Sequence, residues 1–504
     1  MRRTISIILI SIISLSYAIA QNEADALRYS QRFFGSTARS AGMGGAFASL
    51  GGDFSSLGYN PAGIGVFRTT ELTFTPSFSM DEARTTFYGD RRTENEHNFG
   101  LNNIGFVASF NRDKENGWVG TNFGLGYHRH NDFNRRQVIE GRNWDSSMAD
   151  YFAYHPATGA EGFHPDELDP FWERLAYDTY VIDNEEDNPF SYFPLVPLGS
   201  VQREIINTSG HTGEWLFSFG ANYEHKFYLG ATFAIESVDY TRASNYTETN
   251  DHDPEYYFEQ FRFRRNLHTS GTGYTFKAGF IYNPIQMIRL GGSFHLPTFY
   301  NLTDEWDHSM ESWFASDFPV DEYKRPFSAV PTTVNGNPIG PRVRDYSLNT
   351  PFRFIGGIGL MLPGQMGVIS VDYEYVDYTT MRLRETDGGA DFIDQNETIQ
   401  TVYRQTENLK GGVELRLGQF MLRGGYALYG SPFASGQINE DAGLTAWSGG
   451  FGFRERNFYV DLGFVRTMHD RNYFLYDQVP GMEMEPALGR FTNDRFIVTA
   501  GIRF

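Results

Sequence analysis

Apolar and polar residues alternate one by one along the last ten positions of the chain. The apolar set is Phe496, Val498, Ala500, Ile502 and Phe504, and the residues between them are mostly polar or small. Successive side chains of a β-strand point to opposite faces, so the pattern predicts a strand with one apolar and one polar face. The same pattern recurs along most of the chain and predicts about fourteen strands, each long enough to cross a membrane.

The segments between these strands alternate in length. Long segments, the largest expected at about 132–214 and 299–350, alternate with tight links of a few residues. An antiparallel barrel whose two chain ends lie on one side of a membrane requires this alternation. The sequence therefore predicts an all-β fold, a transmembrane antiparallel barrel over residues 71–504, with the long segments as outer loops.

The first seventy residues do not alternate. Residues 1–20 combine Arg2 and Arg3 with a short apolar run and small residues before Gln21, which predicts a cleaved signal peptide. Residues 21–70 show a short helical pattern followed by a glycine-rich run. In a barrel of this width the lumen is the space available to them, so we expect an N-terminal hatch inside the barrel.

The amino-acid composition excludes several kinds of site and partner. The chain has no cysteine, which excludes disulfides, thiolate metal sites and cysteine catalysis. Its net charge of -20 argues against nucleic acid as a partner. Aromatic residues at 16% and 53 glycines suit interfacial girdles and curved strands. We expect location in the outer membrane of a Gram-negative bacterium, in contact with lipid and lipopolysaccharide.

Two segments carry a family resemblance. Residues 42–50, followed by Asp53, and residues 59–63, which read Tyr-Asn-Pro-Ala-Gly, resemble the N-terminal signature of the FadL/TodX family. These are outer-membrane transporters of long-chain fatty acids and other hydrophobic compounds. The resemblance implies a fourteen-stranded barrel with an internal hatch, and a lateral opening beside a kinked third strand. Relatives also include haemin receptors and a type IX secretion component.

The predicted gating residues lie in the hatch and in strand three, and we expect a corner of the hatch to hold it against the inward glycine face of that strand. Asn60, Pro61 and Ala62 form a stiff corner, because proline fixes its own φ and biases the residue before it away from helix. A plain turn leading into strand one is the alternative. Gly120, Asn122 and Gly124 lie on the inward face of strand three, where glycines suit either a gap or simple curvature.

Charged residues recur on inward positions of other strands, and most are expected to pair with one another. Arg289, Arg353 and Arg423 are the candidates for binding a ligand carboxylate, because guanidinium matches carboxylate geometry. His128 and His130 share one face of strand three, but without a visible third ligand no metal site and no cofactor is predicted.

Aromatic residues are frequent in the two largest outer segments. They either form a capture groove for an apolar ligand or pack the loops against one another. They are Trp144, Tyr151, Phe152, Tyr154, Phe163, Phe171, Trp172, Tyr177, Trp306, Trp313, Phe314 and Phe318.

The predicted function is passive transport of a hydrophobic small molecule, such as a long-chain fatty acid, with release near strand three. A non-transporting barrel that serves secretion, assembly or adhesion, or a haemin receptor, is the alternative. No constellation for enzymatic catalysis is recognisable. The terminal aromatic residue, Phe504, is expected to be the signal that the barrel-assembly machinery reads.

Overall fold

The alternation read from the sequence is realised in the computed structural model of the chain. In β1 (Glu71–Phe87), Leu72 and Phe74 are 42% and 49% exposed, whereas Glu71 and Thr73 between them are buried. Apolar side chains therefore point outward and polar ones inward, the reverse of a soluble protein, as in a membrane-spanning barrel. The structure describes residues 23–112, 114, 116–158, 162–316, 318, 326–333, 335–386 and 392–504. The expected signal peptide lies outside these residues.

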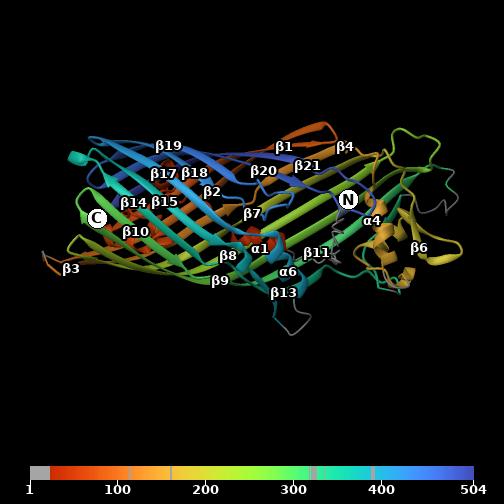
Figure 1. Ribbon diagram of the computed structural model, residues 1–504, viewed down its shortest axis with the longest axis horizontal. Helices are drawn as coiled ribbons and strands as arrows, with labels where there is room; N and C mark the ends of the chain where they lie inside the picture. The colour runs from red at the N-terminus through yellow and green to blue at the C-terminus, as the bar shows by residue number, and fades with distance from the viewer. Residues whose placement is uncertain are drawn as a thin grey trace, which may run out of the picture.

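The ladder of strand pairs closes on itself. β1 pairs with β2 on one side and with the last strand, β21, on the other, and every pairing is antiparallel. The expected barrel of fourteen strands is confirmed (Figure 1). In order around the barrel its elements are β1, β2 (Asp90–Asn111), β3 (Trp118–Asp132) continued by β4 (Arg135–Arg142), β7 (Val201–Tyr223), β8 (Phe227–Thr249), β9 (Phe258–Ile285), β10 (Ile288–His295) continued by β11 (Phe299–Phe314), β13 (Arg342–Asn349) continued by β14 (Arg353–Met361), β15 (Gly367–Asp377) continued by β16 (Arg382–Glu385), β17 (Gln405–Leu417), β18 (Phe420–Tyr429), β19 (Leu444–Arg454), β20 (Phe458–Tyr473) and β21 (Ala487–Arg503).

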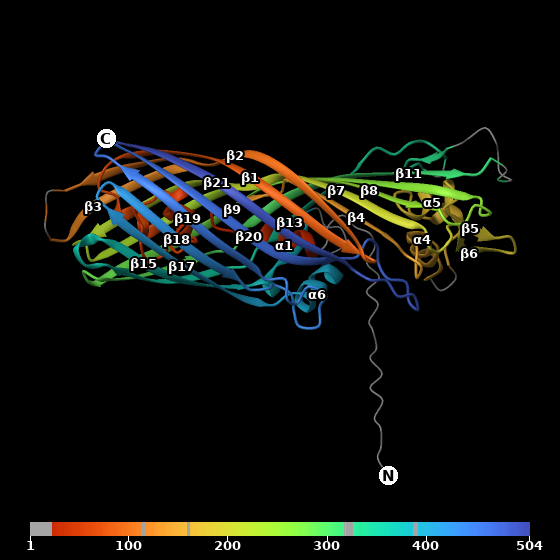
Figure 2. The same ribbon diagram turned by 90° about the horizontal axis from the view of Figure 1, so that it is seen from above.

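An apolar belt surrounds the barrel along the half of its length that lies next to the tight turns between the strands. On β7 it contains Trp215, Phe217, Phe219 and Tyr223, all exposed. A membrane crossing needs about 9–11 strand residues, but β7 and β8 have 23 residues each and β9 has 28. These strands therefore continue well beyond the belt, toward the right of Figures 1 and 2.

The two ends of the barrel differ. At one end, the turn end, tight links join the strands, such as Gly418 with φ +66° between β17 and β18. At the other, the loop end, residues 143–158 and 162–200 form an outer lobe that shares its apolar core with the adjoining strands. The lobe contains α4 (Met148–Tyr154), η2 (His155–Thr158), η3 (Pro165–Glu167), α5 (Glu173–Asp178), β5 (Ile182–Glu185) and β6 (Asn188–Pro194).

The predicted outer loops are shorter than the sequence suggested. The segment expected at 132–214 begins with β4 and ends in the first part of β7, and the segment expected at 299–350 contains β11, β13 and β12 (Phe327–Ala329), which pairs with β11. The reason is physical: outside the membrane both faces of a strand meet water or packed protein, so the apolar alternation that marks a strand disappears.

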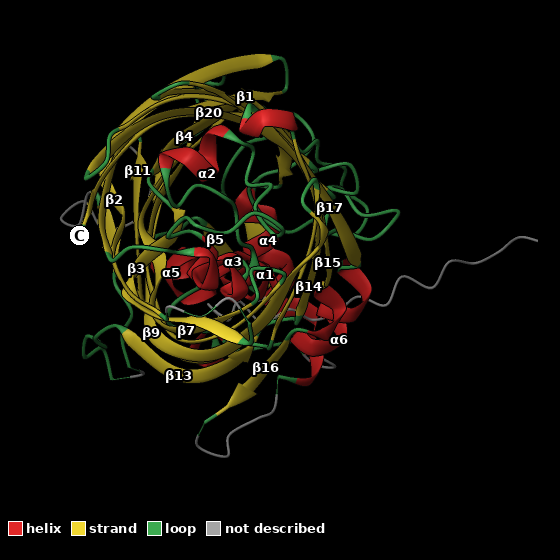
Figure 3. Cartoon of the chain, turned by 90° about the vertical axis from the view of Figure 1, so that its left-hand side faces the viewer, coloured by secondary structure: helices red, strands yellow, loops and turns green. Residues whose placement is uncertain are grey.

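The N-terminal segment lies inside the ring of strands (Figure 3). It contains α1 (Glu23–Ser30), α2 (Ala38–Gly42), α3 (Ser56–Tyr59) and η1 (Pro61–Val66). Nearly all residues of 38–65 are buried, although the segment has no strand of its own. We call residues 23–70 the hatch. Outside the hatch lie η5 (Pro363–Gln365), η6 (Tyr378–Thr380) and α6 (Ile393–Val402). No helix in the described ranges is long and apolar enough to cross a membrane.

Candidate functional site

The Asn60–Pro61 corner joins two parts of the hatch to the barrel wall. The Asn60 side chain accepts a hydrogen bond from Ala62 N at 3.1 Å and so caps η1. Its Nδ2 donates to Ala48 O at 2.5 Å and to Phe280 O on β9 at 3.1 Å. Asn60 therefore has contacts on both the hatch and the wall, and Ala62 packs beside it at zero exposure.

The corner lies on β8 and β9, not on strand three. A Cβ built at Gly230 would lie 2.1 Å from Pro61 O, and one at Gly279 would lie 2.0 Å from Asn60 Oδ1. Only glycine lets the hatch backbone approach the wall this closely. The expectation that the corner faces the glycines of strand three is therefore wrong.

A different part of the hatch covers strand three. Asn122 Nδ2 donates to Ile64 O at 2.6 Å and to Phe67 O at 3.0 Å. A Cβ at Gly124 would lie 2.6 Å from Leu57 Cδ2 and 2.7 Å from Ile64 Cδ1. Gly120 has no such contact, since its nearest neighbour is Asn111 Oδ1 at 3.0 Å.

Strand three has no gap at these glycines. Residues 120–128 of β3 pair with β2 on one side, and β3 also pairs with β7 on the other. The inward face is filled by Phe54, Leu57 and Ile64 of the hatch, which form an apolar cluster with Val107 and Leu216. The glycines thus make room for the hatch, and an opening at 120–124 is absent.

The ladder between β2 and β3 ends next to this face, on the side of the loop end. Its last pair is Asn103 and His128, and residues 90–102 of β2 have no ladder partner on that side within the described part of the chain. At the same level the register of β1 and β2 shifts by one residue between Thr75 and Pro76. Bulges of this kind bend a strand away from its neighbour. We call this border, residues 90–102 against 129–142, the β2–β3 seam.

Side chains rather than backbone groups close the seam. Arg129 Nη2 donates to Ser77 Oγ and to Asn102 Oδ1, both at 3.3 Å. Asn98 Nδ2 donates to Asp132 Oδ2 at 2.7 Å. Farther along, β4 and β2 are joined by two ion pairs, Arg136–Glu94 at 3.1 Å and Arg92–Glu140. The contacts across the seam can therefore break without disturbing a ladder hydrogen bond.

Two of the three predicted ligand arginines are already paired. Arg353 binds Glu374 at 2.7 Å, and Arg423 lies between Glu414 and Asp461, each at 2.6 Å. Arg289 donates to Leu50 O of the hatch at 2.9 Å and has no carboxylate within ion-pair distance among the described residues. Of the three, Arg289 alone keeps its charge without an acidic partner in that part of the chain.

Further charged pairs fasten the hatch to the wall. Arg39 binds Glu414 through two nitrogens, both at 2.9 Å, and Arg32 pairs with Glu236. Lys410, which also binds Glu374, donates to Tyr59 Oη at 2.9 Å. Buried charges are stable only when paired and hydrogen-bonded, so these contacts fix the hatch in one position.

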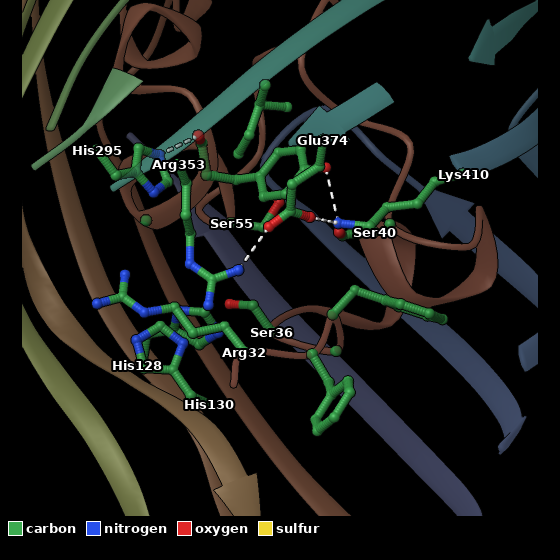
Figure 4. Close-up of a pocket in the computed structure, with 17 residues that line it drawn as sticks. Arg32, Ser36, Ser40, Ser55, His128, His130, His295, Arg353, Glu374 and Lys410 are labelled. Atoms are coloured by element: carbon green, nitrogen blue, oxygen red, sulfur yellow. Dashed lines mark hydrogen bonds and ion pairs between the residues drawn. The ribbon is translucent and has the colours of Figure 1, made fainter. Parts of the chain in front are cut away.

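A small cavity remains between the hatch and β3, β10, β14, β15 and β17 (Figure 4). Its volume is about 50 Å³, enough for a few water molecules but not for a long apolar ligand. The polar and charged side chains in its wall include Arg32, His128, His130, His295, Arg353, Glu374 and Lys410. In this conformation the hatch occupies the lumen at this level.

Comparison with known proteins identifies the architecture. A Pseudomonas aeruginosa FadL homologue superimposes with a TM-score of 0.55 and 12% sequence identity, covering 94% of this chain and 100% of that chain. The Pseudomonas putida toluene transporter TodX gives 0.52 and 12%, covering 94% and 99%. The chain has the FadL fold. No protein-family model and no curated protein matches the sequence. The predicted resemblance is therefore confirmed at the level of the fold.

The predicted outer aromatics of this FadL-type barrel mostly pack against one another. Phe152, Phe171 and Phe314 are buried. The rings of Phe152 and Phe263, 5.6 Å apart, join the lobe to β9, and those of Trp172 and His308, 5.4 Å apart, join it to β11. A shallow depression of about 520 Å³ lies at the ends of β8 and β9 beside Trp313. Its other lining residues are polar. The packing alternative therefore accounts for most of these residues.

The chain end completes the barrel. Phe504 N donates to Thr70 O at 3.0 Å, and Arg503 pairs with Glu71 at 3.0 Å. The Phe504 ring itself is 74% exposed. The backbone of this residue thus joins the two barrel edges, while its ring is open to the surroundings.

Several residues of the site were missed from the sequence. Arg129, Asn98 and Asp132 close the seam, and Glu214 on β7 faces the histidines of β3. Pro76 within a strand was the available signal for the seam, because proline cannot donate to a ladder and often marks a bulge.

Proposed function

We propose that the chain is an outer-membrane channel for passive entry of hydrophobic small molecules, gated by the hatch, with release sideways through the β2–β3 seam. The observation that carries this proposal is the seam itself. It is a stretch of barrel wall held by side chains, directly above the face that the hatch covers. Phe99 and Leu101 are exposed beside it, so a molecule leaving there meets apolar surface.

The fold and the surface support hydrophobic molecules as the class of ligand. TodX, which has the same fold, is a toluene transporter. A hydrophobic molecule gains by leaving the lumen directly into lipid, because a water-filled exit would expose its apolar surface. Long-chain fatty acids belong to this class, and Arg289, without an acidic partner in the described residues, suits their carboxylate.

Assembly and location belong to the same proposal. The exposed ring of Phe504 is available to the barrel-assembly machinery, and the apolar belt to outer-membrane lipid. The lobe at the loop end would face lipopolysaccharide and the outside. Such a role is transport and not catalysis.

One observation favours a second candidate. The outer lobe lies beyond the belt on the ends of β7, β8, β9 and β11, with which it shares a large apolar core. A lobe of this size could serve a barrel that binds a surface partner in secretion, assembly or adhesion without transporting anything. Uptake measurements separate the two candidates.

A cross-link across the seam tests the side exit. The chain has no cysteine, so a thiol reagent acts only on introduced pairs. We replace Asn98 and Asp132, whose side chains touch at 2.7 Å, with cysteine and join them with a short, reducible bifunctional reagent. Uptake of a labelled hydrophobic probe should fall to background and return after reduction.

The matched control joins Phe110→Cys to Thr121→Cys. These residues are ladder partners on β2 and β3, where the wall is already closed, so this cross-link should leave uptake unchanged. If the seam cross-link also leaves uptake unchanged, the side exit is wrong while transport stands. If the unlinked protein takes up no probe of the panel, transport itself is wrong.

A further inference from the structure

Two histidines and a glutamate converge in the lumen on neighbouring strands. His128 and His130 alternate along β3, so both side chains point inward. Glu214 of β7 is the direct cross-strand partner of His128. Register therefore places all three side chains in one patch, although Glu214 is distant from the histidines in sequence. The third ligand that the sequence did not reveal is thus present.

The donor atoms have the spacing of metal ligands. Glu214 Oε1 lies 3.4 Å from His128 Nδ1 and 3.2 Å from His130 Nε2. One donor atom from each residue lies within 4.8 Å of the others. A tetrahedral zinc ion with bonds of about 2.0–2.1 Å separates its ligands by about 3.3 Å. Two of the three ligand separations match that edge.

These donor atoms are buried and without hydrogen bonds. All three residues are at most 8% exposed. His128 Nδ1 and Nε2, His130 Nε2 and Glu214 Oε1 are buried atoms with no hydrogen-bond partner in the part of the chain that the structure describes. Buried polar groups are normally satisfied, and an unsatisfied cluster requires a specific explanation. Both imidazole–carboxylate contacts are within ion-pair distance but fall outside hydrogen-bond geometry, as expected if the three groups share an ion between them.

The surroundings leave room for an ion and one further ligand at this buried position. Lys277 Nζ binds the other carboxylate oxygen of Glu214, Oε2, at 2.5 Å, so Oε1 remains for a second partner. On the hatch side the neighbour is Gly58, where a Cβ would lie 2.7 Å from Glu214 Oε1 and 3.0 Å from His128 Nδ1. Both histidines line the cavity of Figure 4, which holds water-sized space for a fourth ligand.

We propose that His128, His130 and Glu214 bind one divalent transition-metal ion, of which Zn²⁺ is the closest match. Two imidazoles and one carboxylate are a ligand set for zinc and its neighbours, whereas Ca²⁺ and Mg²⁺ prefer oxygen alone. Three protein ligands leave a coordination position facing the cavity. The ion links β3 to β7 beside α3, independently of whether the channel transports hydrophobic molecules.

The direct test is metal binding by the folded, full-length protein in detergent. The protein is stripped with chelator, incubated with Zn²⁺ or Co²⁺ and desalted, and bound metal is measured per chain. We expect about one ion per chain, together with the visible absorption that Co²⁺ shows in a site of four or five ligands. Less than a tenth of an ion per chain would overturn the proposal.

Variants locate the ion. His128→Gln, His130→Gln and Glu214→Gln should each lose the bound metal. His295→Gln should keep it, because His295 lines the same cavity but hydrogen-bonds Tyr59 O at 2.9 Å instead. Retention of metal in both His128→Gln and His130→Gln would place the ion elsewhere and contradict the proposal.

A measurement on the unaltered protein covers the case in which the variants do not fold, judged by gel mobility before and after boiling. X-ray absorption of the Zn²⁺-loaded protein should show two imidazoles and oxygen at about 2.0–2.1 Å. A spectrum without imidazole scattering would overturn the site.

Discussion

At the residue scale, polar side chains that each serve two partners organise the lumen. Asn60 bonds both the hatch and β9, and Arg423 lies between Glu414 and Asp461. A buried polar group that loses its partner is destabilising, so these side chains hold the hatch in one arrangement. None of these contacts is part of the strand ladder. Single substitutions should therefore loosen the hatch and leave the barrel closed.

Asn60→Ala tests this separation. The variant loses the cap of η1 and the bond to Phe280 O, which should lower the local stability of the hatch by about 1–3 kcal/mol. Hydrogen exchange in residues 38–66 should accelerate, while the barrel strands keep their protection. Asn283→Ala, which removes a turn contact to His225 O, is the control and should not affect the hatch. Unchanged exchange in Asn60→Ala would contradict the assigned role.

Gly124→Leu should displace the hatch. The added side chain would overlap Leu57 and Ile64, and overpacking of this kind costs about 1–3 kcal/mol. We expect faster proteolysis of the hatch and altered probe uptake in a barrel of normal yield. Gly356→Leu is the matched control, because no atom lies within 4 Å of a Cβ built there. Equal proteolysis of the two variants would show that the glycine face does not hold the hatch.

At the element scale, β7 shows how far the sequence could predict the fold. Its belt half was predictable, because lipid demands an apolar residue at every second position, as at Trp215, Phe217 and Phe219. Its outer half, from Val201, falls within the loop expected at 132–214. Both faces of the strand meet water or packed protein there, so the sequence shows no apolar alternation. The contacts of Asn122 and Gly124 with the hatch fit their predicted inward position, but the seam depends on register, which alternation does not fix.

A buried carboxyl group, Glu248, should make the stability of the outer lobe depend on pH. Glu248 at the end of β8 accepts hydrogen bonds from Ser147 Oγ at 2.8 Å and Met148 N at 2.7 Å, at the start of α4. Burial raises the pKa of Glu248 to about 7. Because the pKa is raised on folding, the folded lobe holds a proton more tightly than the unfolded chain. Its stability should therefore fall as the pH rises from about 4.5 to about 7, by on the order of 3 kcal/mol.

Other titratable groups in and around the lobe also contribute to its pH dependence. Burial also raises the pKa values of Asp150 and Asp477, which act in the same direction. Burial lowers the pKa of His308 to about 4, which acts in the opposite direction as the pH falls. Proteolysis of residues 143–200 should increase with pH, and Glu248→Gln should flatten the profile. Glu259→Gln, at an exposed position, is the control, and an unchanged profile in Glu248→Gln would contradict the assignment.

At the scale of the whole molecule, three parts with different roles share one barrel. The ladder from β1 to β21 closes the wall, the hatch fills the lumen, and the lobe extends the loop end. A closed barrel satisfies all backbone groups in lipid, so the wall is the stable part and the hatch and seam are the parts that can move. Because of this division, the proposed gating by the hatch would leave the barrel intact.

Deletion of Phe504 separates assembly from stability. The variant loses one backbone hydrogen bond, from Phe504 N to Thr70 O, and an exposed ring that contributes little packing, so the refolded variant in detergent should lose only about 1 kcal/mol. If the ring is the assembly signal, the amount of folded protein in the outer membrane should nevertheless fall strongly. Phe458→Ala, which truncates another exposed belt aromatic, is the control. Normal membrane assembly without Phe504 would contradict the predicted signal.

The central claim, that this barrel admits hydrophobic molecules, is tested most directly by uptake. Cells whose outer membrane lacks other channels of this type are given labelled toluene and labelled long-chain fatty acids, with and without the protein. Heat-dependent gel mobility confirms equal amounts of folded barrel. The account predicts faster entry of at least one of these probes in cells with the protein, and no change for a small polar sugar. Equal entry of every hydrophobic probe with and without the folded barrel would contradict it.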